Sequence, residues 1–219
     1  MRASLFYIVP LVLISLTGKG QVGLEQYFYF NSKQLMTLVP IVSFESEDQW
    51  YAEARYNYED LETFSFYVGK AFTSKSASNY YSGGPTRQRE KVVYSVTPLL
   101  GGVAGKYNGV SGGLNAVVEY RDLFFSTQSQ YTIAYYESGD FFFAWSELGY
   151  QPWKWMFFGV TTQHTYLYQS ARLIVEPGGV IGFTMGQWNF PLYVFSPASD
   201  HYYFVLGASL SIGGFNRNK

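Results

Sequence analysis

Hydrophobic and polar residues alternate along most of this chain, and the alternation is clearest between Gln49 and Tyr58. One face of this segment is apolar and aromatic: Trp50, Ala52, Ala54, Tyr56 and Tyr58. The opposite face is polar and carries charges of both signs: Tyr51, Glu53, Arg55 and Asn57. A two-residue period is that of a β-strand, in which successive side chains point to opposite faces. The segment is therefore predicted to be a strand with one apolar and one polar face.

The rest of the chain divides into similar segments separated by turn residues, and none of them keeps a helical period. We expect strands at 37–46, 49–58, 62–73, 91–104, 108–121, 123–136, 140–150, 154–168, 172–185, 189–196 and 201–212, with Tyr27 to Asn31 as one more. Most connections are as short as those of hairpins, so that neighbouring strands should be antiparallel. The pattern predicts an all-β, up-and-down fold.

The polar faces of these strands are unusually poor in charge, which bears on the direction in which they point. The last predicted strand shows this, because its polar face holds mainly small residues such as Ser209 and Ser211. A soluble barrel would need charged residues on its outside. In a transmembrane barrel the apolar faces contact lipid and the polar faces line the lumen. The lipid-facing residues of this strand would then be Tyr202, Phe204, Leu206, Leu210 and Ile212.

The number of strands depends on two weak segments. Twelve strands result when Tyr27 to Asn31 is included, and ten result when the region 172–196 is merged. The long polar connection 74–90 would lie on the periplasmic side of a twelve-stranded barrel and on the outer side of a ten-stranded one. Bacterial barrels have even strand numbers. We predict a single antiparallel transmembrane barrel of twelve strands, with ten as the alternative.

The N-terminal residues resemble an export signal. Arg2 precedes the apolar run Leu5 to Leu16, and small residues at Gly18 and Gly20 suggest cleavage before Gln21. The run is too short to cross about 30 Å of hydrocarbon as a helix. The chain has no cysteine, which excludes a lipoprotein and disulfides. We therefore expect a signal peptide at 1–20, an outer-membrane barrel domain at 21–219, and export to the outer membrane of a Gram-negative bacterium.

Composition supports this assignment. Aromatic residues make up 21% of the chain and charged residues only 14%. Four tryptophans lie near predicted strand ends, where an aromatic girdle would meet the membrane interface: Trp50, Trp153, Trp155 and Trp188. The net charge of −1 offers no basic surface for nucleic acid. The expected partners are the lipid bilayer and the barrel-insertion machinery, and no oligomeric state follows from the sequence.

On these features the chain resembles the outer-membrane β-barrel superfamily. The resemblance is carried by the signal, the alternating strands and the closing strand Tyr202 to Ile212. The segment Tyr51-Ala52-Glu53-Ala54-Arg55-Tyr56 also resembles the small twelve-strand oligosaccharide-channel porins. This resemblance implies a structural barrel or a narrow channel for small solutes.

Charged residues on the predicted lumen face are the candidate functional residues: Glu53, Arg55, Glu119, Arg121 and Glu147. They could form a constriction that selects solutes by charge. Alternatively, Glu53 or Glu119 could pair with Arg55 or Arg121 and close the lumen, since buried charges need partners. The near-equal number of acids and bases favours the closed lumen.

Two alternative functions remain open. A membrane-embedded lipid-modifying hydrolase would need His164 or His201 beside a nucleophile, and the sequence shows no such pairing. A periplasmic lipocalin-like barrel would turn its apolar faces inward and bind a lipid. We favour a non-enzymatic barrel. Two distant histidines without cysteines give no metal-ligand pattern, and we expect neither metal nor cofactor.

Overall fold

The computed structural model describes residues 20–30, 36–74, 92–135 and 139–213. All regular structure in these ranges is β-strand. The described residues contain no helix long and apolar enough to span a bilayer. The predicted signal peptide lies outside the described residues, except for Gly20.

The strands are β1 (Gly20–Phe30), β2 (Thr37–Ser46), β3 (Trp50–Tyr56), β4 (Thr63–Lys70), β5 (Phe72–Thr73), β6 (Val93–Gly105), β7 (Gly109–Tyr120), β8 (Leu123–Ala134), β9 (Phe141–Trp153), β10 (Met156–Leu167), β11 (Arg172–Met185), β12 (Trp188–Phe195) and β13 (Tyr203–Gly213). Each long strand pairs antiparallel with its neighbours in sequence order. β4 pairs with β6 from Thr63 opposite Gly105, and β1 pairs with β13 from Gln21 opposite Gly213. These pairings close a barrel of twelve strands, with β5 as a short extra strand on β6.

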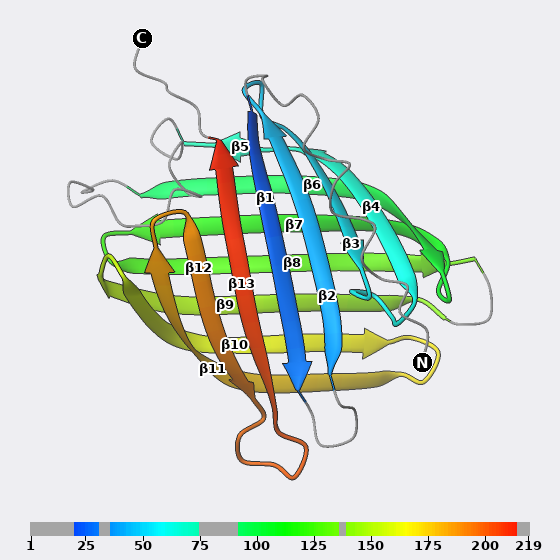
Figure 1. Cartoon of the computed structure of the whole chain (residues 1–219). Coiled ribbons are helices and arrows are strands. Elements are labelled where there is room, and N and C mark those ends of the chain that lie inside the picture. Colours follow the sequence, from blue (N-terminus) through cyan, green and yellow to red (C-terminus); the bar gives the residue numbers. More distant parts are fainter. Residues whose placement is uncertain (1–19, 31–35, 75–91, 136–138, 214–219) are drawn as a thin grey trace, which may run out of the picture.

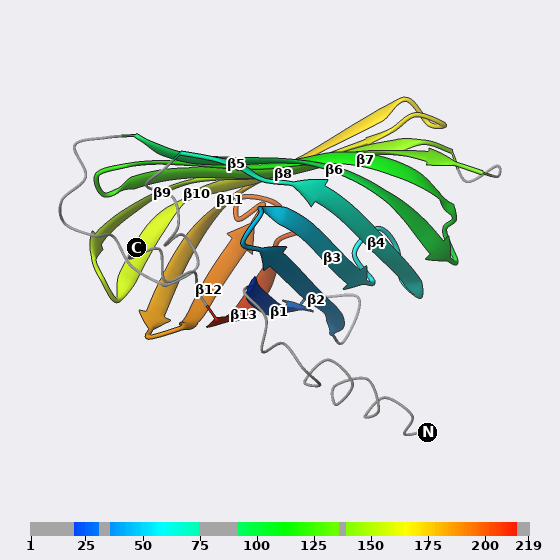
Figure 2. The same ribbon diagram turned by 90° about the horizontal axis from the view of Figure 1, so that it is seen from above.

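Figures 1 and 2 show how the closed sheet is arranged. In Figure 1, β1 and β13 lie side by side at the front and cross the strands β6 to β10 behind them, as expected for the tilted strands of a barrel. Figure 2 shows β6 to β8 in one wall and β12, β13, β1 and β2 in the facing wall. The prediction of an all-β barrel with twelve strands is confirmed, and the ten-strand alternative is wrong.

The strand bounds differ most from the predicted ones in β1 and at Ala71. β1 begins at Gly20, well before the predicted Tyr27, and pairs along its length with β2 and β13. The predicted strand 62–73 is divided into β4 and β5 at Ala71, whose N–H donates to the carbonyl of Gln49 just beyond the start of β3. The region 172–196 forms two separate strands, β11 and β12, as predicted, and not the single merged segment of the ten-strand alternative.

The two ends of the barrel have connections of different length. We call the end that holds Gly20 and Gly213 the terminus end, and the opposite end the loop end. At the terminus end, β2–β3, β7–β8, β9–β10 and β11–β12 are joined by only two or three residues. The connection between Thr73 and Val93 also lies at the terminus end, as the twelve-strand count predicts; its residues 75–91 lie outside the described ranges.

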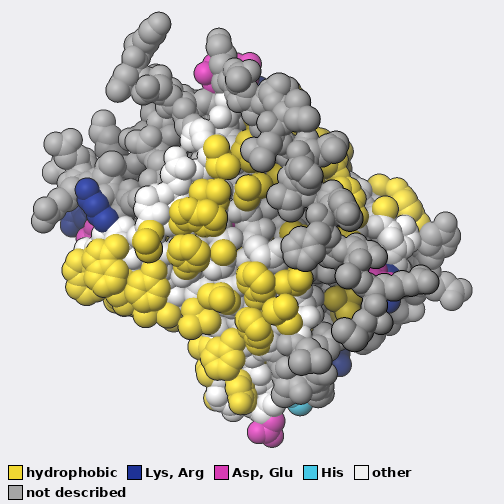
Figure 3. Space-filling view, viewed as in Figure 1, with side chains coloured by type: hydrophobic (Ala, Val, Ile, Leu, Met, Phe, Trp, Pro, Cys, Tyr) yellow, Lys and Arg dark blue, Asp and Glu magenta, His cyan; other side chains and the backbone are white. Residues whose placement is uncertain are grey.

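The outer face of the barrel is apolar and exposed. Large hydrophobic side chains point outward from every wall, for example Phe66 (48% exposed), Leu100 (69%) and Val160 (62%). In Figure 3 they form a broad band over β12, β13 and β1, with charged side chains at its margins. A lipocalin-like barrel would bury these residues inside, so the outer face agrees with the transmembrane arrangement instead.

Glycines on the inner face let aromatic rings lie flat against the wall. A Cβ atom at Gly149 would collide with the ring of Phe124 on β8, and one at Gly182 with the ring of Phe157 on β10. Phe124 and Phe157 also contact each other, with ring centroids 5.6 Å apart. The small residues of one strand therefore make room for the large residues of the next, which fills the lumen.

Candidate functional site

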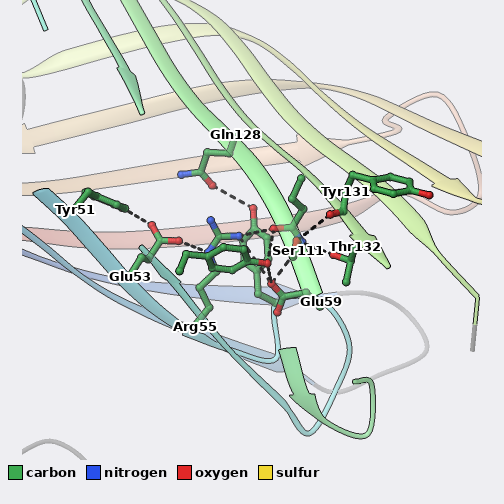
Figure 4. Close-up of polar contacts among 11 residues, drawn as sticks. Tyr51, Glu53, Arg55, Glu59, Ser111, Gln128, Tyr131 and Thr132 are labelled. Carbon is green, nitrogen blue, oxygen red and sulfur yellow. Dashed lines mark hydrogen bonds and ion pairs between the residues drawn. The ribbon is translucent and has the colours of Figure 1, made fainter. Parts of the chain in front are cut away.

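A buried arginine organises the polar side of the lumen. Arg55 on β3 is 3% exposed, and its Nε donates a hydrogen bond to Glu53. Its Nη1 donates to Oε1 of Gln130 on β8 at 2.8 Å and lies 4.0 Å from Oε1 of Glu59. Figure 4 shows the side chains of Glu53, Arg55 and Glu59 converging from β3 and the β3–β4 connection. The predicted pairing of Glu53 with Arg55 is thus present in the structure.

Two tyrosines enclose the same guanidinium. The ring centroid of Tyr58 lies 4.2 Å from Arg55 Cζ, and that of Tyr67 lies 4.7 Å away. Tyr67 donates to Oε1 of Glu59 at 3.0 Å. Tyr58 belongs to the β3–β4 connection, which turns into the lumen, and burial raises its pKa above the usual value. We call Arg55 and these contacting residues (Glu53, Tyr58, Glu59, Tyr67 and Gln130) the Arg55 cluster.

Aromatic side chains bridge the lumen beside this cluster. Trp145 on β9 has its ring centroid 5.7 Å from that of Tyr27 on β1, 5.0 Å from Tyr193 on β12 and 5.5 Å from Phe195 on β12. We call these four residues the occluding layer. Phe195 and the inward-facing Val205 on β13 are 0% exposed. Since a wide water-filled pore would wet such residues, the lumen is filled by side chains at this level.

A cavity of about 300 Å³ lies in the lumen beside the occluding layer. Its lining includes Tyr27, Trp145 and Tyr193 of that layer, together with Glu25 on β1 and Glu147 on β9. Residues of two terminus-end turns also line it, namely Arg121 and Asp122 between β7 and β8 and Gln187 between β11 and β12. We call this cavity the vestibule, because it extends from the occluding layer to the terminus end.

Two carboxylates of the vestibule, those of Glu25 and Glu147, each accept a hydrogen bond from a tyrosine. Tyr27 donates to Oε2 of Glu25 at 2.8 Å, and Tyr193 donates to Oε2 of Glu147 at 3.2 Å. Tyr193 interacts electrostatically with both carboxylates. Among the described residues, no Lys, Arg or His comes within 4.0 Å of either one.

The predicted charge cluster is divided between these two places. Glu53 and Arg55 belong to the Arg55 cluster, whereas Glu147 (8% exposed) and Glu119, which faces inward from β7, line the vestibule. Arg121 lies in the β7–β8 turn with a positive φ of 55°, exposed, with its Cζ 5.2 Å from the Tyr120 ring centroid. It is not on the strand face where the alternation put it, because the strand ends one residue earlier.

The residues predicted to meet lipid lie on the outside. Tyr202 (53% exposed) directly precedes β13, on which Phe204 (43%), Leu206 (40%) and Ile212 (41%) point outward, and Leu210 shares their face. The four girdle tryptophans are exposed and all lie at the terminus end: Trp50, Trp153, Trp155 and Trp188. Contact of these residues with lipid stays a prediction.

Sequence reasoning missed several residues that shape the site. Glu25 belongs to the part of β1 that was not predicted, and Glu59 lies in a connection that was read as a simple turn. Trp145 was the one tryptophan not assigned to the girdle. The alternation could have indicated its position in the lumen, because Trp145 and Glu147 are two residues apart and lie on the same inner face of β9.

The histidines are not part of either group. His164 lies on the outer face of β10, where its strand neighbours are Ala144 and Val175, and neither side chain is a nucleophile or a carboxylate. His201 is exposed in the β12–β13 connection. Within the described ranges, no three His, Cys, Asp or Glu residues form a group that could hold a metal ion. No hydrolase constellation is therefore assembled around His164 or His201 in these ranges.

Comparison with known proteins agrees with the barrel topology. No protein-family model matches the chain, and no curated protein matches its sequence. In fold it is similar to the KdgM porin, with a TM-score of 0.59 at 10% identity, covering 87% of this chain and 99% of that one. The KdgM porin in complex with disordered oligogalacturonate gives 0.56 at 11% identity, covering 87% and 99%. The NanC porin gives 0.51 at 10%, covering 88% and 99%. The predicted resemblance to outer-membrane β-barrels is therefore confirmed at the level of fold.

Proposed function

We propose that this protein is an outer-membrane barrel that forms a narrow channel for small solutes, and that the occluding layer restricts passage through it. The apolar outer face and the porin-like fold support a position in the outer membrane. The predicted signal peptide supports export there. The observation that carries the proposal is the vestibule, a lumen cavity that reaches the terminus end and stops at Trp145 and its partners.

The charge of the lumen argues against an acidic sugar chain as the solute. The KdgM porin has been solved with oligogalacturonate, which carries many carboxylates. Here Arg55 is the only buried cation of the described residues, and it is already engaged by Glu53 and Glu59. Glu25 and Glu147 add further negative charge to the vestibule. A polyanion would be repelled, so neutral or cationic solutes fit this lumen better.

Planar-bilayer conductance tests the proposal. We expect the wild-type protein to give small or infrequent current steps, because the Tyr27 and Trp145 rings lie 5.7 Å apart across the lumen. The double variant Tyr27→Ala/Trp145→Ala removes this contact and should give clearly larger steps. Phe204→Ala on the outer face is the matched control and should leave the steps unchanged.

Two results would overturn the proposal. Large, steady steps from the wild-type protein would show that the layer does not restrict passage. If a folded double variant conducts no better than the wild type, the barrel is a closed structural element and not a channel. Circular dichroism on each variant establishes that the strands are still formed.

A further inference from the structure

The wall of the vestibule presents hydrogen-bond acceptors without matching donors. Glu25 and Glu147 each accept one hydrogen bond from a tyrosine, and a carboxylate has room for several more. Two side-chain amides that line the cavity, Asn115 on β7 and Asn189 on β12, have a buried Oδ1 without a hydrogen-bond partner. Buried polar atoms normally have partners, so these oxygens point to a ligand rich in donors.

The charge of the cavity points in the same direction. Glu147 is 8% exposed, and no cation of the described residues pairs with it or with Glu25. Arg121, which lies at the terminus-end opening of the vestibule, contacts the Tyr120 ring and pairs with neither carboxylate. Burial of carboxylates without a cation in direct contact is costly, and a bound cation would offset that cost.

The remaining wall of the vestibule is aromatic. Tyr27, Trp145 and Tyr193 surround the space beside the two carboxylates. The face of an aromatic ring attracts an organic cation, most strongly when water is excluded. A bare metal ion would gain little from these rings, whereas an alkylammonium group would use both the rings and the carboxylates.

From these observations we infer that the vestibule is a binding site for small organic cations that carry primary ammonium groups. Carboxylates of Glu25 and Glu147 would accept from the ammonium N–H groups, the Asn115 and Asn189 oxygens would accept from further donors, and the alkyl portion would lie against the Trp145 and Tyr193 rings. The inference deepens the proposed function, on which it rests, because it names the solute class that this cavity selects.

A series of three molecules of similar length and different charge tests the inference on the refolded full chain in detergent micelles. Calorimetric titration at mildly alkaline pH should show saturable binding of 1,5-diaminopentane. It should show no binding of the neutral 1,5-pentanediol or of the anionic glutarate. Equal binding of the diol would assign the vestibule to neutral polyols, and absence of diamine binding would leave it without this function; either result overturns the inference.

Isosteric variants locate the site. Glu25→Gln and Glu147→Gln should each weaken diamine binding by about tenfold or more, the effect of losing one hydrogen bond to a charged group. Glu176→Gln, on β11 and outside the cavity lining, is the matched control and should bind the diamine like the wild type. Unchanged affinity in both vestibule variants would place the ligand elsewhere and overturn the inference. If either variant does not fold, the wild-type series still decides.

Because binding is measured without a current, the two proposals fail separately. Diamine binding by a barrel that never conducts would contradict the channel and leave the site intact. Conductance through the double variant without diamine binding to the wild type would contradict the site alone.

Discussion

At the scale of single residues, the lumen depends on one cation. Arg55 is surrounded by Glu53, Glu59 and Gln130 and lies against two tyrosine rings. The side chains of Glu53 and Glu59 are 3% and 0% exposed. Removal of the guanidinium would leave both carboxylates buried without a counterion. Removal of one partner from an exposed ion pair in the same barrel would cost little stability.

We expect Arg55→Ala to lower the free energy of unfolding by about 3–5 kcal/mol, the usual cost of breaking a buried ion pair. Urea titration of the refolded barrel in lipid vesicles measures this value. Lys106→Ala is the control, since Lys106 and Asp60 form an exposed pair at 3.6 Å; such pairs contribute about 1 kcal/mol or less. A similar small loss in both variants would mean that water screens the Arg55 cluster, as in a wide channel.

At the scale of elements, each strand separates an apolar outer face from a filled inner face. On β13 the outward Phe204 and Leu206 are 43% and 40% exposed, while Val205 between them is 0% exposed. Ser209 lies on the inner face of the same strand and lines the vestibule. The two faces of one strand should therefore respond differently to a charge.

Leu206→Arg should destabilise the barrel by about 2–4 kcal/mol if the side chain lies near the middle of the bilayer. Ser209→Arg should cost less, because its side chain would enter the vestibule, which is lined by the carboxylates of Glu25 and Glu147. The free energy of unfolding of both variants, measured in lipid vesicles, tests this difference. If both positions tolerate arginine equally, the outer face of β13 does not meet lipid.

The alternation in the sequence was sufficient to predict most strands and the faces of Glu53 and Arg55, because a two-residue period is a local property. It was not sufficient for β1, since Gly20 to Gln26 is a strand only through its pairing with β2 and β13. Glu25 was missed for that reason. The contacts of Glu59 and Arg121 could not be predicted from the alternation, because both lie in turns, where the period ends and the backbone direction depends on conformations such as the positive φ of Arg121.

At the scale of the whole molecule, closure of the sheet leaves no long edge. All strands of the described ranges belong to one sheet, and its ends meet where β4 pairs with β6. Such a barrel unfolds only when many strand pairs separate together. Its apolar outer face, in contrast, needs detergent or lipid to remain dispersed.

We therefore expect the refolded protein to be heat-modifiable. Samples in dodecyl sulfate should migrate differently on a gel before and after boiling, because the closed barrel resists the detergent until it is heated. Circular dichroism of the unboiled sample should show strand and almost no helix. A protein that stays monomeric in buffer without detergent, or that shows a helical spectrum, would contradict the transmembrane barrel.

The pairing of β1 with β13 has a consequence for how the chain acquires its fold. Gln21 meets Gly213, so this pair of strands can form only after the last strand has been synthesised. Contacts so distant in sequence make folding slow. During that delay both strands present unpaired N–H and C=O groups, which can template aggregation. A chaperone that shields β1 until β13 has been synthesised would therefore determine what fraction of the newly made chains folds correctly.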